Sequence, residues 1–335
     1  MEADSSKPKE EGRKVPDDVH TVFAFSLPYA IPISDGNYVV KLGNKNAIIK
    51  IKRIQRKDVA GFTGTGTVQM RFDKFGRSSF SAIFMEFPWR MNLSEEGRRP
   101  VTLGDVPPRN KAKEGVLRFL NRFIETVRYI TQEYWVEPAR YQDLLAYEVF
   151  YWDGKTRYPA QLMLLDTGVG GIGIGTGNPF QISAEKLGEL NDILSNELPL
   201  ETSRIFLLNS RDACLQEDFR LAVVEAVTAL EIALYRFIRI RGEKLKIPKE
   251  DLENSIKNVG LTGNIIVILR MLTENLEQPD ETIVEECRLG IRVRNKILHE
   301  GLREVSSTET ENRIVTIEKM VDYLNRLIMA IETSK

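Results

Sequence analysis

The spacing of apolar residues changes near residue 200, and this change limits the folds that the chain can adopt. Before it, short runs rich in Val, Ile, Phe and Tyr alternate with Gly, Asp, Asn and Pro, a pattern typical of strands joined by turns. After it, apolar residues recur every three or four positions over long stretches, which indicates amphipathic helices. We therefore expect an α+β domain with a mainly antiparallel sheet over residues 21–200, followed by an all-α helical bundle over residues 205–335.

The first half contains strand-like runs and two helical ones. One helix is expected at 115–134, where Val116 and Leu120 begin an apolar stripe, and another at 183–196, with Ser183 as its N-cap. The expected strands cover 21–27, 37–42, 47–54, 67–72, 79–87, 145–152 and 160–165.

The second half is expected to be a bundle of helices joined by short loops. The stretch 197–212, which overlaps the expected start of the bundle, is interpreted as a linker. Gly242 and Gly301 are expected to end the helices that precede them, since glycine readily adopts the left-handed conformation found at helix C-termini. The expected helices cover 215–241, 249–259, 262–275, 281–300 and 307–333.

The composition predicts a soluble, cytoplasmic protein. The net charge of the 335-residue chain is −1, so any contact with nucleic acid has to come from a local basic patch. No run reaches the ~18–20 apolar residues of a membrane helix, so no membrane contact is expected. Residues 1–20 are rich in charged residues and are expected to be a disordered tail. The two cysteines suit a reducing compartment, and we expect no cofactor and no metal site.

The chain has only two histidines, and one of them lies five residues after an arginine in an expected helix. His299 follows Arg294 in the segment 294–299 (RNKILH), whereas His20 belongs to the expected tail. Cleavage of RNA without a metal needs a base for the 2′-OH proton, an acid for the leaving 5′-oxygen and a cation on the phosphate. Imidazole suits the first two roles and guanidinium the third. On an α-helix the two side chains lie about 140° apart, so we expect them to meet most readily where two copies of the helix pack together.

Arg294 occupies a position that an apolar residue would normally take. It lies between Ile291 and Leu298 on the expected buried stripe of its helix, and a charge there has to be paired or to face a functional cavity. Glu231 interrupts the stripe of the first long helix in the same way. We expect Glu231 and Arg294 to pair, and Asn295 to orient the imidazole or to bind a ribose or phosphate oxygen.

A cluster of cations closes the first long helix and forms a candidate RNA-binding track. Such a cluster can follow an RNA backbone, or it can simply complement the negative end of the helix dipole while it remains solvated. The cluster consists of Arg236, Arg239, Arg241 and Lys244.

From about residue 212 to residue 333 the chain resembles HEPN domains (higher eukaryotes and prokaryotes nucleotide-binding), in particular their Apea-like group. The resemblance rests on Arg294, the polar Asn295 and His299, on the helical segment 222–231, and on the closing amphipathic helix. The signature of the family is an arginine, usually followed by a polar residue, and then a histidine a few positions later. Four residues separate the arginine from the histidine here.

The resemblance implies a bundle that forms a homodimer, with the two motifs meeting at the interface as a composite site. It also implies a metal-independent endoribonuclease of the kind found in toxin, anti-phage defence and RNA-processing systems. His299 would be the general acid/base, Arg294 would anchor the phosphate, and Asn295 would position the motif or the substrate. We add Glu231 as a supporting residue. Other members bind nucleotides or partners without cleaving, so a noncatalytic nucleotide-binding, dimerisation or partner-binding module is the alternative. The domain over 21–200 is expected to sense, target or regulate, through a protein partner.

Overall fold

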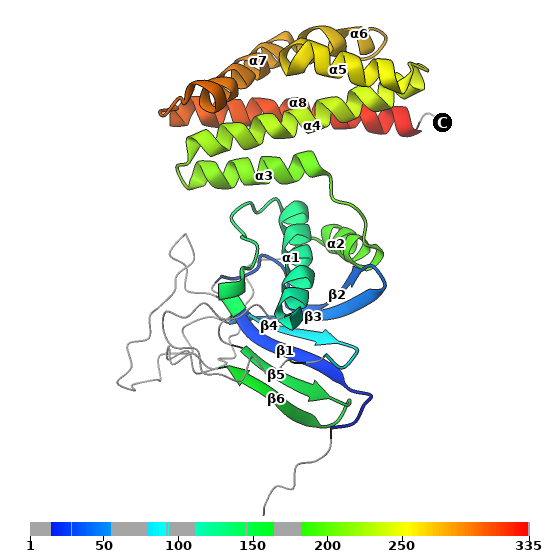
Figure 1. Ribbon diagram of the computed structural model, residues 1–335, viewed down its shortest axis with the longest axis vertical. Coiled ribbons are helices and arrows are strands. Elements are labelled where there is room, and N and C mark those ends of the chain that lie inside the picture. The colour runs from blue at the N-terminus through cyan, green and yellow to red at the C-terminus, as the bar shows by residue number, and fades with distance from the viewer. Residues whose placement is uncertain are drawn as a thin grey trace, which may run out of the picture. The chain divides into compact units, whose positions relative to one another are not determined.

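The computed structural model describes residues 15–27, 29–54, 80–91, 93, 111–144, 147–163 and 182–333. The chain divides into two compact units (Figure 1), the first ending at Leu198 and the second beginning at Pro199, with Gln132–Trp135 grouped with the second.

The first unit is built on a six-stranded antiparallel sheet with the strand order β2-β3-β4-β1-β5-β6. The strands are β1 (His20–Leu27), β2 (Gly36–Leu42), β3 (Lys45–Ile54), β4 (Phe80–Phe87), β5 (Tyr147–Trp152) and β6 (Arg157–Met163), and the helices are α1 (Lys111–Thr131) and α2 (Ala184–Asn196). Short connections pair β2 with β3 and β5 with β6 as hairpins. The expected α+β architecture is confirmed, and the further strand expected at 67–72 lies outside the described residues.

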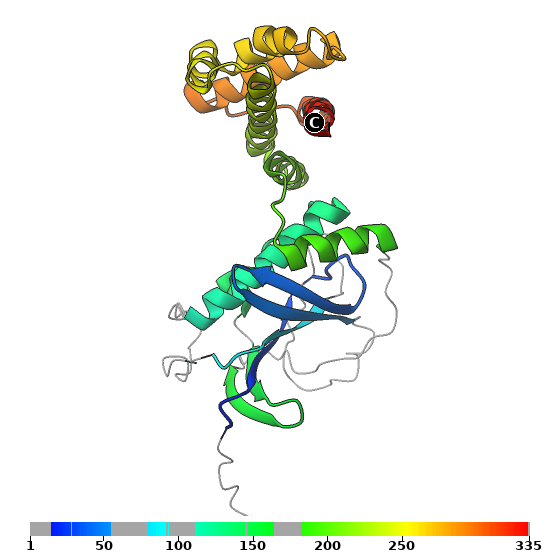
Figure 2. The ribbon, with the colours of Figure 1, turned by 90° about the vertical axis from the view of Figure 1, so that its right-hand side faces the viewer.

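Both helices of the first unit lie on the same side of the sheet (Figure 2). Aromatic rings join α1 to the strands: the ring centroids of Phe119 and Phe87 are 5.6 Å apart, and those of Phe123 and Tyr38 are 5.2 Å apart. The hydroxyl of Ser183 accepts a hydrogen bond from the backbone N–H in the first turn of α2, as expected for an N-cap. The apolar stripe of α1 therefore forms one wall of the core of this unit.

The start of the first unit corrects the expectation of a disordered tail over residues 1–20 only at its end, at Val19 and His20. Val19 is buried, and His20 is the first residue of β1, where it pairs with Trp152 of β5. The Nδ1 atom of His20 also bonds to the carboxylate of Glu86 on β4. The sheet extends this far because Val19 packs into the core while the residues after it find strand partners on both sides. Residues 1–14 lie outside the described part of the chain.

The second unit is a bundle of helices, as expected. Its elements are α3 (Thr202–Leu215), α4 (Phe219–Lys244), α5 (Lys249–Gly263), α6 (Leu269–Leu272), α7 (Glu281–Asn295) and α8 (Ser307–Thr333), with the π-helical segments η4 (Asn264–Ile268) and η5 (Lys296–Glu300). α4 contacts α3, α5, α7 and α8 (Figure 1). Ala226, Leu230, Ala233 and Phe237 of α4 are fully buried. A helix that is apolar on most of its faces belongs at the centre of a bundle, and α4 takes that place.

Two helix boundaries differ from the expectation. The stretch 197–212, interpreted as a linker, is mostly α3, and its Leu207 and Leu208 are buried. Gly242 does not end α4, which continues past it. Gly242 is buried because Leu252 of α5 packs over it, and a Cβ atom at this position would come within 2.7 Å of the Leu252 Cδ2 atom. Tertiary packing therefore decides both boundaries.

Among the described residues, the stretch Lys249–Leu272 is long and apolar enough, by length and composition, to be a candidate membrane span. Its most apolar window has a mean hydropathy of 1.2, and 28% of that window is buried. The backbone of Gly260 is not helical (φ 68°, ψ 171°), so the stretch consists of two helical pieces. Ile265 and Leu269 are fully buried in the core of the bundle. A helix that packs in a bundle core passes the same test as a membrane helix.

Lys113 of α1 is a buried cation in the first unit, with 4% of its surface exposed. Its Nζ atom lies over the rings of Tyr147 and Tyr141, 4.2 Å and 5.1 Å from their centroids. Burial lowers the pKa of this amine to about 8, because desolvation disfavours the charged form. The two aromatic faces attract the cation and oppose this shift.

We predict that the unfolding free energy of the wild type rises with pH, relative to that of Lys113→Met, between about pH 8 and pH 10.5. The pKa of Lys113 in the folded state, about 8, lies below its ordinary value of 10.5. The unfolded chain therefore binds more protons in this window, and stability rises by up to about 1.4 kcal/mol per pH unit. Urea unfolding at a series of pH values measures the difference. Lys111→Met, which removes an exposed amine from the same helix, is the control and should follow the wild type. Parallel curves for the wild type and Lys113→Met would contradict the prediction.

Candidate functional site

The last turn of the helix that carries the arginine–histidine motif is not α-helical. α7 ends at Asn295 and continues as η5, a π-helical segment in which hydrogen bonds join residues five apart. The N–H of Gly301 donates to the carbonyl of Lys296, and Gly301 ends the helix in the left-handed conformation (φ 70°), as expected. Arg294 and His299 are also five residues apart. Most of the chain between them therefore belongs to the π-helical segment.

Arg294 is held by two side chains. Its Nη2 atom lies 3.4 Å from Oε2 of Glu231 on α4, and its Nη1 atom donates to Oδ1 of Asn295 at 3.2 Å. The expected pair of Glu231 and Arg294 is therefore present. The side chains are 29% and 25% exposed, respectively, so the pair is only partly desolvated. Tyr235, one turn after Glu231, interacts with the same carboxylate, and its pKa is raised by burial first and by Glu231 second.

Arg294 lies on the buried face of α7, but the residues that continue this face on either side of it differ from the expected ones. Cys287 and Gly290 are buried before it and Ile297 is buried after it, whereas Leu298 is 51% exposed. The stripe follows alternating steps of three and four residues, and Ile297 rather than Leu298 continues it. The Nε atom of Arg294 is buried and has no hydrogen-bond partner within the described part of the chain. The inner half of the arginine thus lies in the core, and its outer half is held by Glu231 and Asn295.

His299 lies on the exposed surface of η5. Within the described residues of one chain, no hydrogen bond or ion pair joins it to Arg294, Asn295 or Glu231. The residues predicted for the site therefore form two groups: a connected set of Glu231, Arg294 and Asn295, and a separate imidazole that faces solvent. In this position the imidazole is available to a ligand or to a second copy of the chain.

The basic cluster at the end of α4 is partly engaged within the bundle. Arg239 makes a two-bond ion pair with Glu253 of α5, with Nε–Oε1 and Nη2–Oε2 distances of 2.6 Å and 3.1 Å. The Nε atom of Arg241 donates to the carbonyl at the end of α6 at 3.1 Å. Arg236 and Lys244 are exposed. Two of the four cations predicted to bind RNA thus fix α4 to its neighbours, because carboxylate and carbonyl acceptors lie opposite them.

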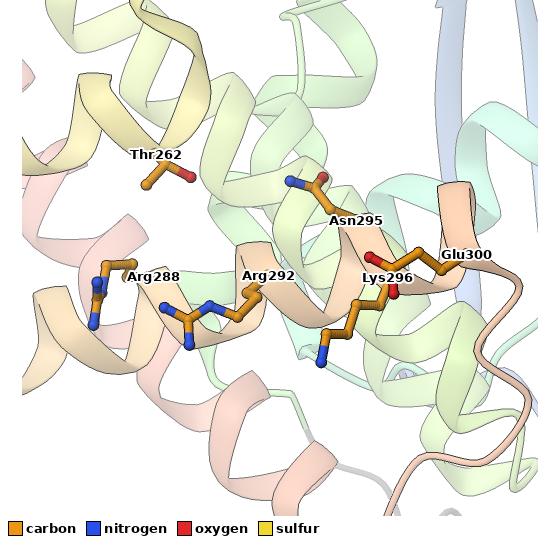
Figure 3. A pocket seen from close by; sticks show the side chains of 6 residues that line it. All are labelled: Thr262, Arg288, Arg292, Asn295, Lys296 and Glu300. Carbon is orange, nitrogen blue, oxygen red and sulfur yellow. The ribbon is translucent and has the colours of Figure 1, made fainter.

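A pocket of about 200 Å³ opens beside the motif, between α5 on one side and α7 with η5 on the other (Figure 3). Arg288, Arg292 and Lys296 recur every four residues, so they share one face of the helix. Asn295 belongs both to the pocket and to the contacts of Arg294. The pocket is lined by Thr262, Arg288, Arg292, Asn295, Lys296 and Glu300.

The lining of the pocket is mainly cationic, with three basic side chains and one carboxylate. Arg288 is paired with Glu285 at 2.5 Å, and its hydrogen bond lowers the pKa of that carboxyl. Arg292 and Lys296 are exposed, and their side chains make no hydrogen bond or ion pair with the described residues. The cations of the pocket are not among the residues predicted from the sequence, although their four-residue spacing along one expected helix is a signal that could have identified them.

No protein-family model, curated protein or solved structure matches this chain. The likeness to HEPN domains therefore rests on Arg294, Asn295 and His299 and on the helices around them. Among the residues that the structure describes, no three His, Cys, Asp or Glu side chains stand close enough together to hold a metal ion.

We predict a coupling energy of about 1 kcal/mol between Glu231 and Arg294 in a double-mutant cycle of Glu231→Gln and Arg294→Gln. Because the pair is partly desolvated, its coupling energy should lie at or slightly above the upper end of the range of roughly 0.2–1 kcal/mol that fully exposed pairs show. Urea unfolding of the four proteins measures the coupling. The pair of Arg140 and Glu137 is the control, because it has the same separation of 3.4 Å but exposed fractions of 67% and 38%, and its coupling should be close to zero. Equal coupling in the two cycles would contradict the prediction.

Proposed function

We propose that the helical bundle is a metal-independent endoribonuclease that cleaves RNA by attack of the 2′-OH, at a site shared by two copies of the chain. The observation that supports this function most is the arrangement at the end of α7. There Arg294 is held between Glu231 and Asn295, and the exposed His299 follows on a π turn. π-Helical turns are rare and occur frequently at functional sites, so this turn favours a functional role for the motif.

The reaction needs two proton carriers, and each copy of the chain supplies one imidazole at the proposed site. His299 takes the proton of the 2′-OH, O2′ bonds to phosphorus, the P–O5′ bond breaks, and O5′ receives a proton from His299 of the partner subunit. The products are a 2′,3′-cyclic phosphate and a 5′-hydroxyl end. Arg294 stabilises the negative charge that develops on the phosphate oxygens. Glu231 and Asn295 hold the guanidinium in one orientation during this step.

A second candidate function is a noncatalytic module that binds a nucleotide or a partner, or that joins two copies of the chain. The observation that favours it is the ion pair itself, since Glu231 already compensates the charge of Arg294 without any ligand. If this function holds, Arg294→Ala acts on the fold alone. The cost should be about 1–3 kcal/mol, below the ~3–5 kcal/mol of breaking a fully buried pair, because both side chains are partly exposed.

We predict that the purified full-length protein cleaves single-stranded RNA in the presence of EDTA, and that His299→Ala lowers the rate at least about 100-fold. Arg294→Gln should lower it by a similar factor, because it removes the cation from the phosphate. His20→Ala is the matched control, since His20 is the other histidine of the chain and bonds to Glu86 in the sheet of the first unit, and it should cleave like the wild type. Gel analysis of an end-labelled oligonucleotide measures the rates.

The ends of the products test the mechanism independently of the variants, because attack by the 2′-OH leaves a 2′,3′-cyclic phosphate and a 5′-hydroxyl. The substrate provides a second test. An RNA with a single 2′-deoxynucleotide at the cleavage position should resist, because the nucleophile is missing. A His299→Ala protein that cleaves at the wild-type rate would contradict the proposed nuclease mechanism, in which His299 carries the protons. So would a wild-type protein that forms dimers in sedimentation experiments and leaves RNA intact, and the noncatalytic module would then stand.

A further inference from the structure

We infer that the pocket between α5 and α7 with η5 binds a phosphate of an RNA backbone through Arg292 and Lys296, beside the phosphate that Arg294 holds. The choice of RNA rests on the proposed function. The site itself rests on the lining of the pocket, which comes from two helices and contains three cations.

The charges of the bundle favour this pocket over the end of α4 as the place where RNA binds. At the end of α4, Arg239 and Arg241 are engaged by acceptors of the bundle. In the pocket, Arg292 and Lys296 are exposed and make no hydrogen bond or ion pair with the described residues. A phosphate that enters the pocket therefore displaces no hydrogen-bond partner of these two cations, although Glu285 also interacts electrostatically with Arg292. Arg288 adds positive charge at the far end, although Glu285 shares it.

Hydrogen-bond donors complete the pocket. Oδ1 of Asn295 accepts from Arg294, which leaves the Nδ2 group of Asn295 as a donor. In Figure 3 the amide of Asn295 and the hydroxyl of Thr262 point toward each other from α7 and α5, above the row of cations on α7 and η5. Asn295 thus joins the pocket to the motif, so that one strand of RNA can contact Arg294 and the pocket with neighbouring phosphates.

The size of the pocket favours a backbone phosphate over a whole nucleotide. Sites that enclose a complete small ligand usually measure about 300–1,000 Å³, whereas this pocket measures about 200 Å³. Its lining, within the described part of the chain, also lacks an aromatic side chain on which a base could stack. These properties fit a phosphate and part of its ribose, with the bases directed elsewhere.

Both π-helical segments of the described bundle border the pocket. Thr262 precedes η4 by one turn or less, and Asn295 and Lys296 stand where η5 begins. A π turn places one extra residue in the helix and redirects the side chains near it. This local geometry explains how Asn295 can contact Arg294 while it lines the pocket together with Lys296.

Fluorescence anisotropy with a labelled 12-nucleotide RNA that carries 2′-O-methyl groups tests the inference, since this probe binds but cannot be cleaved. The double variant Arg292→Gln/Lys296→Gln should bind about 10-fold more weakly or worse. The slope of log K against log salt should fall in magnitude by about 0.7 for each phosphate that the variant no longer neutralises. The matched control is Arg220→Gln/Lys319→Gln, which removes one exposed arginine and one exposed lysine elsewhere on the bundle, and it should keep the wild-type slope.

The carboxylate of the pocket provides a test in the opposite direction. Glu300→Gln removes the one anionic side chain of the described lining, so it should tighten binding of the same probe several-fold. A merely structural role for the pocket would not produce tighter binding. All these positions are solvent-accessible, and circular dichroism checks that each variant keeps its helices.

The outcomes separate this inference from the proposed function. Equal binding by the wild type and the double variant, or equal weakening in the matched control, overturns the phosphate site even if the protein cleaves RNA. If the wild type leaves RNA intact but binds the probe through Arg292 and Lys296, the result contradicts the proposed nuclease function and supports the phosphate site. Binding of AMP as tight as that of the probe, abolished in the same double variant, would identify a nucleotide site and overturn the assignment to an RNA backbone.

Discussion

A guanidinium on the buried face of α7 has to be satisfied, and the organisation of the site depends on how the bundle does this. Replacing a buried ion pair with apolar residues is often neutral or even stabilising, so such a pair contributes little to stability by itself. Here the pair uses a carboxylate from α4, the central helix, and extends through Tyr235 on one side and Asn295 on the other. The result is a polar connection from the core of the bundle to its surface. The proposed role of Arg294 in holding a phosphate would account for this cost in packing, which stability alone does not explain.

The three polar side chains of the motif differ in how firmly they are held at this end of the helix. Arg294 is fixed by its partners, Asn295 is shared between Arg294 and the pocket, and His299 is exposed. The change from α7 to η5 produces this distribution, because it alters the angular spacing of side chains within a few residues. Phosphate chemistry makes the same distinction, since it needs a cation in a fixed place and proton carriers that the substrate can reach.

Periodicity and local chemistry are enough to predict the large elements and the central ion pair. The helix at 307–333 matches α8, and two apolar stripes interrupted by opposite charges predict the contact of Glu231 with Arg294. Residue spacing predicts these features because a constant angle per residue sets the faces of a helix, and because an unpaired charge in a core is costly.

What periodicity misses depends on tertiary packing and on hydrogen-bond patterns. α3 is not apparent in the sequence because its apolar run is short, and it becomes a helix of the bundle when Leu207 and Leu208 pack into it. Lys113 lies before the helix expected at 115–134, yet it is buried in α1 against tyrosines from a later part of the chain. The π turn cannot be read from residue spacing at all, and the spacing does not show that Ile297 rather than Leu298 continues the buried stripe.

The separation of His299 from Arg294 within one chain also bears on how many chains the site needs. An imidazole that already bonded to Arg294 or Glu231 would belong to the internal contacts of the bundle and would have no need of a second copy. In the proposed function, an exposed imidazole that is separate from the held guanidinium leaves one half of an acid–base pair on each chain, and the proposed reaction requires both halves. The proposed phosphate site of Arg292 and Lys296 lies at the same end of the helix, where it would guide an RNA strand toward this edge of the bundle. Assembly of two copies across His299 would therefore complete the chemistry and align the RNA in one step.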